Sequence, residues 1–193
     1  MSQPKIVAFA GSLRSGSFNK KLLAIAADAA RAAGAEVTVV DLRELALPLF
    51  DGDLEDASGL PEGAKKLKSL MRESDGFIIA SPEYNSSITG ALKNAIDWVS
   101  RTESDDEPEL VAFRGKSAAL LSASPGALGG MRSLITVRSI LGNLGVLVLP
   151  DQVSIPTAHE AFDEAGKLSD DRKAKKVARL VQGLVELLTK LKN

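Results

Sequence analysis

Residues 5–19, Lys-Ile-Val-Ala-Phe-Ala-Gly-Ser-Leu-Arg-Ser-Gly-Ser-Phe-Asn, decide the fold of this chain. The first six are an almost wholly apolar run typical of a buried strand, and an Ala/Leu-rich stretch with helical character follows Asn19 directly. The junction between them combines two glycines, three serines, Asn19 and Arg14. Such a turn directs backbone N–H groups, hydroxyls and one cation toward the positive end of a helix dipole. We expect it to bind a phosphate group.

The spacing of the glycines separates several kinds of phosphate loop. A nucleoside-triphosphate loop needs a lysine directly after its second glycine, whereas Gly16 is followed by Ser17 and Phe18. A dinucleotide fingerprint needs a glycine where this chain has Leu13. A hydroxyl-rich loop with one arginine instead favours a terminal monoester phosphate, such as that of FMN. The alternative is an ordinary Ser/Gly-rich turn between a strand and a helix, with no ligand.

Composition limits the class of protein. The chain has 193 residues, which favours a single domain over residues 1–193. Its net charge is −1 with acidic and basic residues interspersed, so we expect neither nucleic acid nor an anionic membrane surface as a partner. It contains no cysteine, which excludes disulfides, thiolate metal sites and cysteine nucleophiles. Because no apolar run is long enough to span a membrane and the first strand begins too early to leave room for a signal peptide, we expect a cytoplasmic protein.

Strand-like and helix-like segments alternate along the chain. The strand-like runs are residues 5–10, 36–40, 76–81, 116–122 and 145–149, and the helical patterns are residues 18–33, 61–73, 87–99, 128–144 and 170–191. This alternation predicts an α/β protein with a parallel sheet covered by helices on both faces. Its rhythm fits a flavodoxin-like, doubly wound sheet of five parallel strands in the order 2-1-3-4-5.

Two further loops are expected beside the phosphate loop, because ligands of open α/β sheets bind at the carboxyl ends of the strands. The loop after the third strand, residues 81–87, contains a proline, a tyrosine, an asparagine and several hydroxyls. The loop after the fourth strand, residues 122–130, contains three glycines that let backbone approach a flat ligand. Taken singly, these loops also fit a proline turn with a serine cap and a glycine-rich helix cap. Their convergence at one edge favours a ligand site.

Four ordered motifs resemble the NAD(P)H-dependent FMN reductase family. They are Gly11-Ser-Leu-Arg-x-Gly-Ser-x-Asn19, Ser81-Pro-Glu-Tyr-Asn85, Ala91-Leu-Lys-Asn-Ala-Ile-Asp-Trp98 and Gly126-x-x-Gly-Gly130, and the likeness covers residues 5–150. The resemblance implies FMN as cofactor, NADPH or NADH as co-substrate, and a homodimer or homotetramer. The FMN ligands it implies are Ser12, Arg14, Ser17 and Asn19 for the phosphate, Pro82, Glu83, Tyr84 and Asn85 along one edge of the isoalloxazine ring, and Ser124, Gly126 and Gly129 on its far side.

The chemistry that the resemblance implies is ping-pong hydride transfer from NAD(P)H through bound FMN to a small-molecule electron acceptor, such as a quinone or free flavin. The flavin carries the reaction, so we expect no catalytic side chain and no metal. The alternative is a non-enzymatic flavodoxin-type electron carrier or flavin-binding module. Such carriers are usually strongly acidic and sandwich the flavin between aromatic residues, whereas aromatic residues make up only 4% of this chain. The loop spacing disfavours a Rossmann dehydrogenase.

Other notable residues are expected to have structural roles. The acidic stretches 42–59 and 101–114 lack the ligand spacing of a calcium loop and are predicted to be solvated loops. Asp41 and Glu44 are predicted to cap a short helix, and His159 to lie in a surface loop. Trp98 is predicted to lie in the core, although the helix over residues 87–99 that carries it is expected to take part in self-association.

Overall fold

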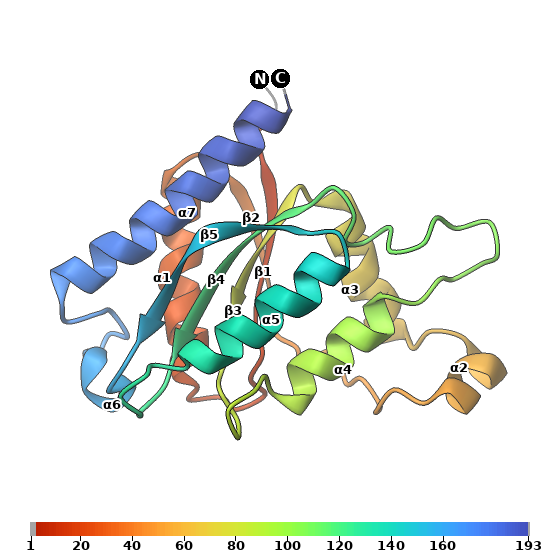
Figure 1. Cartoon of the computed structure of the whole chain (residues 1–193), viewed down its shortest axis with the longest axis horizontal. Coiled ribbons are helices and arrows are strands. Elements are labelled where there is room, and N and C mark those ends of the chain that lie inside the picture. The colour runs from red at the N-terminus through yellow and green to blue at the C-terminus, as the bar shows by residue number, and fades with distance from the viewer. Residues whose placement is uncertain (1–2, 193) are drawn as a thin grey trace.

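A five-stranded parallel sheet forms the centre of the protein, whose computed structural model describes residues 3–192 (Figure 1). The strands are β1 (Lys5–Ala10), β2 (Glu36–Val40), β3 (Gly76–Ala80), β4 (Ser117–Ala123) and β5 (Leu147–Ile155). Their order is β2-β1-β3-β4-β5, and every neighbouring pair is parallel. The predicted fold class and strand order are therefore confirmed.

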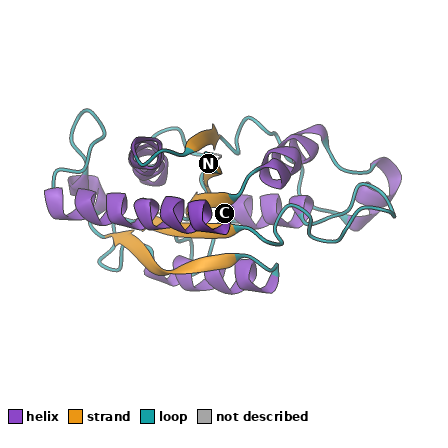
Figure 2. Ribbon diagram, turned by 90° about the horizontal axis from the view of Figure 1, so that it is seen from above, coloured by secondary structure: helices purple, strands orange, loops and turns teal. Residues whose placement is uncertain are grey.

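Helices cover both faces of the sheet. They are α1 (Phe18–Ala32), α2 (Gly52–Ser58), α3 (Glu62–Glu73), α4 (Gly90–Val99), α5 (Met131–Asn143), α6 (Ala158–Ala161) and α7 (Asp171–Leu191). The apolar sides of α1 and α7 pack on one face, and those of α3, α4 and α5 pack on the other. This double cover explains why the central strands β3 and β4 are buried along their whole length. The start of β1 and the end of α7 lie side by side (Figure 2), where Lys192 Nζ, just after α7, donates to Gln3 O, just before β1, at 3.2 Å.

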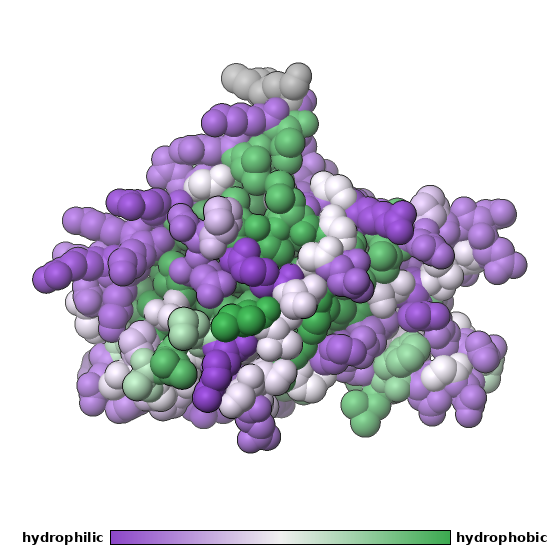
Figure 3. Space-filling model, viewed as in Figure 1, coloured by the Kyte–Doolittle hydropathy of each residue, from purple (hydrophilic) through white to green (hydrophobic). Residues whose placement is uncertain are grey.

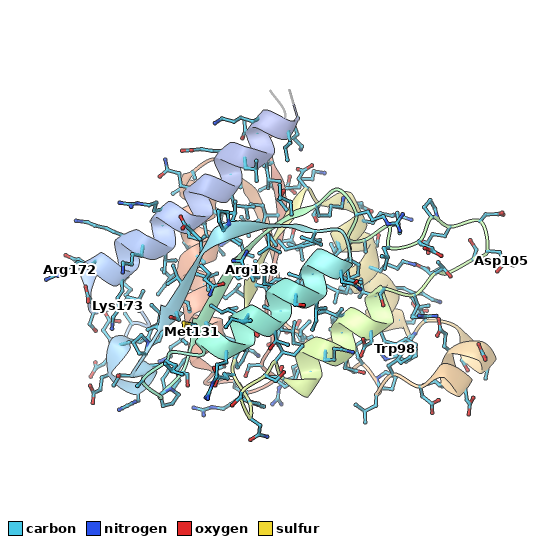
Figure 4. The ribbon with its side chains drawn as sticks, viewed as in Figure 1. Trp98, Asp105, Met131, Arg138, Arg172 and Lys173 are labelled. Atoms are coloured by element: carbon cyan, nitrogen blue, oxygen red, sulfur yellow. The ribbon has the colours of Figure 1, made fainter. Side chains whose placement is uncertain are left out.

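The predicted end of the fifth strand is wrong. Pro150 looks like a strand breaker in the sequence, but β5 continues past it to Ile155. The pairing with β4 shifts between Ala118 and Leu120, so that the proline lies in an irregularity of an edge strand, where its missing N–H is tolerated. Arg138 of α5 points toward this segment (Figure 4), and its Nη2 donates to Pro150 O at 3.3 Å.

Two helices begin three residues later than predicted. Helix α4 begins at Gly90, because the Thr89 hydroxyl accepts a hydrogen bond from Leu92 N at 3.1 Å and caps the helix. Helix α5 begins at Met131, after Gly130 in the left-handed conformation with φ 86°. The turn at Asp41 and Glu44 forms, but it is not continued into a helix.

The acidic stretches are more ordered than solvated loops. The first contains α2, which Asp51 caps by accepting a hydrogen bond from Asp53 N at 3.0 Å. The second projects from the body of the molecule near Asp105 (Figure 4), yet it is anchored by Lys68, whose side chain is 2% exposed. Lys68 forms ion pairs with Glu107 and, at 3.4 Å, with Glu103. Within residues 3–192, no group of three or more His, Asp or Glu side chains is arranged to hold a metal ion.

Trp98 lies fully in the core, as predicted, and its Nε1 donates to Pro48 O at 2.8 Å. Leu92 and Ile96 of the same helix are also buried within the chain, so these apolar side chains of α4 do not form an exposed surface for self-association. His159 lies in the short helix α6 with an exposed side chain, so the prediction of a surface position is confirmed but that of a loop is not. In the part of the chain that the structure describes, no helix combines the length and apolarity needed to cross a membrane.

Candidate functional site

The loops after β1, β3 and β4 meet at the carboxyl edge of the sheet, at its lower end in Figure 1. One pocket there is lined by residues of all of them, namely Ser12, Arg14, Ser17, Phe18, Asn19, Pro82, Glu83, Tyr84, Ala123, Ser124 and Pro125. Most of the residues predicted for the site are thus brought together. Asn85, Gly126 and Gly129 belong to the same loops but do not line this pocket.

In the phosphate loop, residues 11–17, several carbonyl groups accept hydrogen bonds from within the chain, whereas several amide groups have no partner among residues 3–192. Two of these carbonyl oxygens accept from distant side chains: Gly11 O accepts from Thr89 Oγ1, and Leu13 O accepts from Arg43 Nε at 2.6 Å. Two others accept from within the loop: Arg14 O accepts from Ser17 N, and Gly16 O accepts from Arg14 Nη2, both at 3.3 Å. Among residues 3–192, the backbone N–H groups of Leu13, Ser15, Gly16 and Phe18 have no partner. Free donors at a helix N-terminus attract anions. The donor set therefore fits a phosphate group.

The hydroxyls of this loop are buried, whereas its arginine is not. Ser12 and Ser17 are 4% and 6% exposed. Ser17 Oγ caps α1 by accepting from Asn19 N at 3.2 Å, and Ser12 Oγ accepts from Arg14 N at 3.3 Å. The Arg14 guanidinium is exposed, and it lies 5.9 Å from the centre of the Phe18 ring with no carboxylate paired to it in the described part of the chain. Its charge is available to an anionic ligand.

Asn19 ties the phosphate loop to the end of β4. Its Nδ2 donates to Ala123 O at 2.8 Å, and Ala123 N donates to its Oδ1 at 3.0 Å. Both atoms are buried, and the two residues are 104 positions apart in the sequence. One N–H of the Asn19 amide is left for a ligand.

The loop after β3 is fastened to the start of α5. The Glu83 carboxylate accepts from Arg132 N at 3.1 Å and from Arg132 Nε at 2.6 Å. Arg132 is the second residue of α5, so Glu83 satisfies a free amide at a helix end whose cap residue, Gly130, has no side chain. Ser133 Oγ lies 2.9 Å from Ser81 O and adds a second link. The role of Arg132 was not predicted from the sequence, since nothing in the motif marks it as the partner of Glu83.

A tight turn presents the polar tip of the same loop. The backbones of Tyr84 and Ser87 are hydrogen-bonded in both directions, at 3.0 and 3.1 Å. Between them, Asn85 and Ser86 have positive φ angles of 49° and 66°, which are uncommon for residues other than glycine and often occur at functional sites. Tyr84 is 56% exposed and lines the pocket at the carboxyl edge.

The glycines of the loop after β4 have different roles. A Cβ on Gly129 would lie 2.7 Å from the backbone of Ile155 and Pro156, and a Cβ on Gly130 would lie 1.8 Å from the buried Ser122 Oγ. Both therefore let the loop pack closely on the sheet. A Cβ on Gly126 would meet only Ser124 Oγ, at 3.7 Å, so Gly126 faces open space.

Fold and site together define the class of this protein as a flavodoxin-like α/β protein with one pocket at the carboxyl edge of its sheet, where the loops after β1, β3 and β4 meet. Residues 4–160 match the family described as NADPH-dependent FMN reductase, and the chain belongs to this family.

Relatives and solved structures agree with that assignment. The chain is 36% identical over 181 residues to an NAD(P)H-dependent FMN reductase of Pseudomonas aeruginosa, covering 93% of this chain and 92% of the relative. It is 38% identical over 146 residues to a quinone reductase of Escherichia coli, covering 75% and 73% of the two chains. The structure of FerB, a flavoenzyme NAD(P)H:(acceptor) oxidoreductase from Paracoccus denitrificans, matches with a TM-score of 0.78 at 27% identity, covering 97% of this chain and 98% of FerB. The chain is an oxidoreductase that depends on FMN and NAD(P)H.

Proposed function

We propose that this protein transfers electrons from NADPH or NADH to quinones and similar small-molecule acceptors, and that donor and acceptor occupy the same open face in turn. The observation that carries the proposal is the phosphate loop, because several of its amides and the exposed Arg14 guanidinium have no acidic or carbonyl partner from outside the loop among residues 3–192 and suit the monoester phosphate of FMN. The names of the relatives, a quinone reductase among them, support the acceptor class. FMN supplies the hydride and electron chemistry when it is bound.

Within this proposal, the predicted residues divide into three groups. Ser12, Arg14, Ser17 and Asn19 hold the phosphate, residues 82–85 follow one edge of the ring, and Ser124, Gly126 and Gly129 form its other boundary. Burial of the two serine hydroxyls supports the first group, since buried donors have already lost their water and lose little more on binding. The open space at Gly126 supports access for a second flat molecule.

In this scheme, the loop after β3 orients the bound flavin and polarises it. Its position is fixed by the Glu83 to Arg132 bonds, and the N–H of Tyr84 is used inside the turn by Ser87 O. This leaves the N–H groups of Glu83 and Asn85, which have no partner among residues 3–192, to stabilise negative charge on a ligand. No side chain that exchanges protons is required.

The test is the reductive half of the cycle, measured without oxygen. Protein loaded with FMN should lose its yellow colour when NADPH or NADH is added, without a partner reductase, and a quinone should restore the colour. A protein that binds FMN tightly, but that neither nucleotide bleaches within minutes, would instead be an electron carrier and would contradict the proposal.

We further propose that the protein forms a homodimer or homotetramer through the start of α5. Leu128, Met131 and Ile135 are 47%, 41% and 59% exposed, and Met131 and Ile135 are one helical turn apart. Apolar atoms interrupt the polar surface over α5 (Figure 3), and Met131 lies beside the ligand edge (Figure 4). Light scattering should show an oligomer that Met131→Glu shifts toward monomer. An active wild-type monomer at micromolar concentration would contradict this assignment.

A further inference from the structure

We infer that Arg43 is a positioning residue for the phosphate loop, an inference that rests on the FMN site proposed above. Arg43 follows β2, outside the loops that the sequence places at the site. Its Nε donates to Leu13 O at 2.6 Å, across 30 positions of sequence. It touches the outer side of the loop and does not line the ligand pocket.

The loop needs a restraint on that outer side because packing does not supply one. Leu13 is 42% exposed. A cavity of about 300 Å³ lies beside it, lined by Leu13, Leu42, Arg43, Ala46, Leu47, Ala91 and Asn94. Arg43 lines this cavity and its side chain reaches the backbone of the loop. A single charge-assisted hydrogen bond therefore restrains the loop on the side where no packed core supports it.

Arg43 is itself held in place by the helix that the phosphate loop begins. Asp41 Oδ1 accepts from Arg43 N at 3.0 Å, and Asp41 Oδ2 forms an ion pair with Lys20 of α1 at 2.6 Å. Burial alone would raise the pKa of Asp41, but the bonds from Lys20 and Arg43 hold that pKa below its ordinary value, so the carboxylate stays charged. A series of polar contacts thus connects α1 to the phosphate loop, from Lys20 through Asp41 and Arg43 to Leu13.

The bond to Leu13 O sets the orientation of one peptide group. In a trans peptide the C=O and the following N–H point in opposite directions. With Leu13 O held outward by Arg43, the Arg14 N–H points inward, where it donates to Ser12 Oγ at 3.3 Å. Arg43 therefore fixes the placement of Ser12 and Arg14, two of the four residues assigned to the phosphate, without lining the ligand pocket.

Three substitutions of Arg43 distinguish the effect of its hydrogen bond to Leu13 O from the effect of its positive charge. Glutamine places an N–H donor at the same point along its side chain as Arg Nε, so Arg43→Gln keeps the bond and loses the charge. Lysine has a methylene at that point and its nitrogen one atom further out, so Arg43→Lys keeps the charge and loses the donor at the position of Arg Nε. We expect FMN affinity to fall about tenfold in Arg43→Lys and Arg43→Ala and to stay near wild type in Arg43→Gln. Riboflavin, which lacks the phosphate, should bind all four proteins alike.

Dissociation constants for FMN and riboflavin, measured by flavin fluorescence, decide the outcome. Retained affinity in Arg43→Lys with loss in Arg43→Gln would show that charge acts at a distance and would overturn the inference. Equal weakening of both flavins, or no weakening in any variant, would overturn it as well. If the wild type binds FMN no more tightly than riboflavin, the proposed phosphate site fails first, and that failure is visible without any variant.

Discussion

Replacing Asn19 with alanine tests the link between the phosphate loop and β4. The change removes the Asn19 bonds to Ala123 O and Ala123 N, which are 2.8 and 3.0 Å long. Both backbone groups of Ala123 would then be buried without partners, at about 1–3 kcal/mol each. Because two effects at one residue are not fully additive, we expect the free energy of unfolding to fall by about 2–5 kcal/mol. A loss of about 3 kcal/mol corresponds to a melting temperature lower by about 6–12 °C for a chain of this size.

Urea unfolding followed by circular dichroism measures this loss directly. Asn143→Ala is the matched control, because Asn143 is exposed at the end of α5, and we expect a change within about 0.5 kcal/mol there. Asn19→Asp should be no better than Asn19→Ala, since its second carboxylate oxygen would face Ala123 O and repel it. If Asn19→Ala lost less than about 1 kcal/mol, the link would not be a significant part of the fold.

Three other predictions concern the ligand edge and the acidic loop. Arg14→Ala should weaken FMN by about 1.5–3 kcal/mol and leave riboflavin unchanged, because the Arg14 guanidinium is exposed and has no acidic partner among residues 3–192; equal weakening of both flavins would contradict its assignment to the phosphate. Gly126→Val should slow turnover more than it weakens FMN, since its side chain would extend into open space; unchanged rates with several acceptors would place this loop away from the ring. Burial alone would raise the pKa of Glu107, but the bonds from Lys68 and from the backbone lower that pKa overall. The ion pair with Lys68 should therefore stabilise the fold at pH values above the ordinary glutamate pKa, and this stabilisation should be lost as the pH falls through the lowered pKa of Glu107. Glu107→Gln should flatten the dependence of the free energy of unfolding on pH in that range, and an unchanged dependence would contradict this role of the ion pair.

The strand order was predictable because it follows from local patterns. Apolar runs that alternate with amphipathic helices specify a doubly wound parallel sheet, and central strands such as β3 are buried on both faces, which makes their signal strong. The ends of elements were harder, because tertiary contacts decide them. Pro150 is tolerated in β5 since it lies in a shifted register at the edge of the sheet, and Thr89 caps α4 because its hydroxyl also reaches Gly11 O.

The site was predictable where one loop supplies both the donors and their geometry. Ser12, Arg14 and Ser17 lie within six residues, so the pattern that marks them also places them. Arg43 and Arg132 were missed because each acts on a loop distant in the sequence, and one sequence does not state which distant partner a side chain will meet. The same reasoning applies to Asn19, whose main contacts are with a residue 104 positions away.

The carboxyl edge is therefore held by side chains that connect different elements, and this organisation links stability to ligand binding. A ligand that binds only the folded state stabilises it by RT ln(1 + [L]/Kd), about 2.7 kcal/mol at a concentration of 100 Kd. If Asn19 contributed only to the stability of the fold, Asn19→Ala would lose the same free energy with and without FMN, because Kd would not change. If Asn19 also contributes to FMN binding, through its second amide N–H or by placing the loop, the loss must be larger at saturating FMN, by RT times the logarithm of the ratio of the two dissociation constants. Unfolding measured in both conditions thus separates the contribution of Asn19 to stability from its contribution to binding, which its hydrogen bonds to Ala123 alone do not.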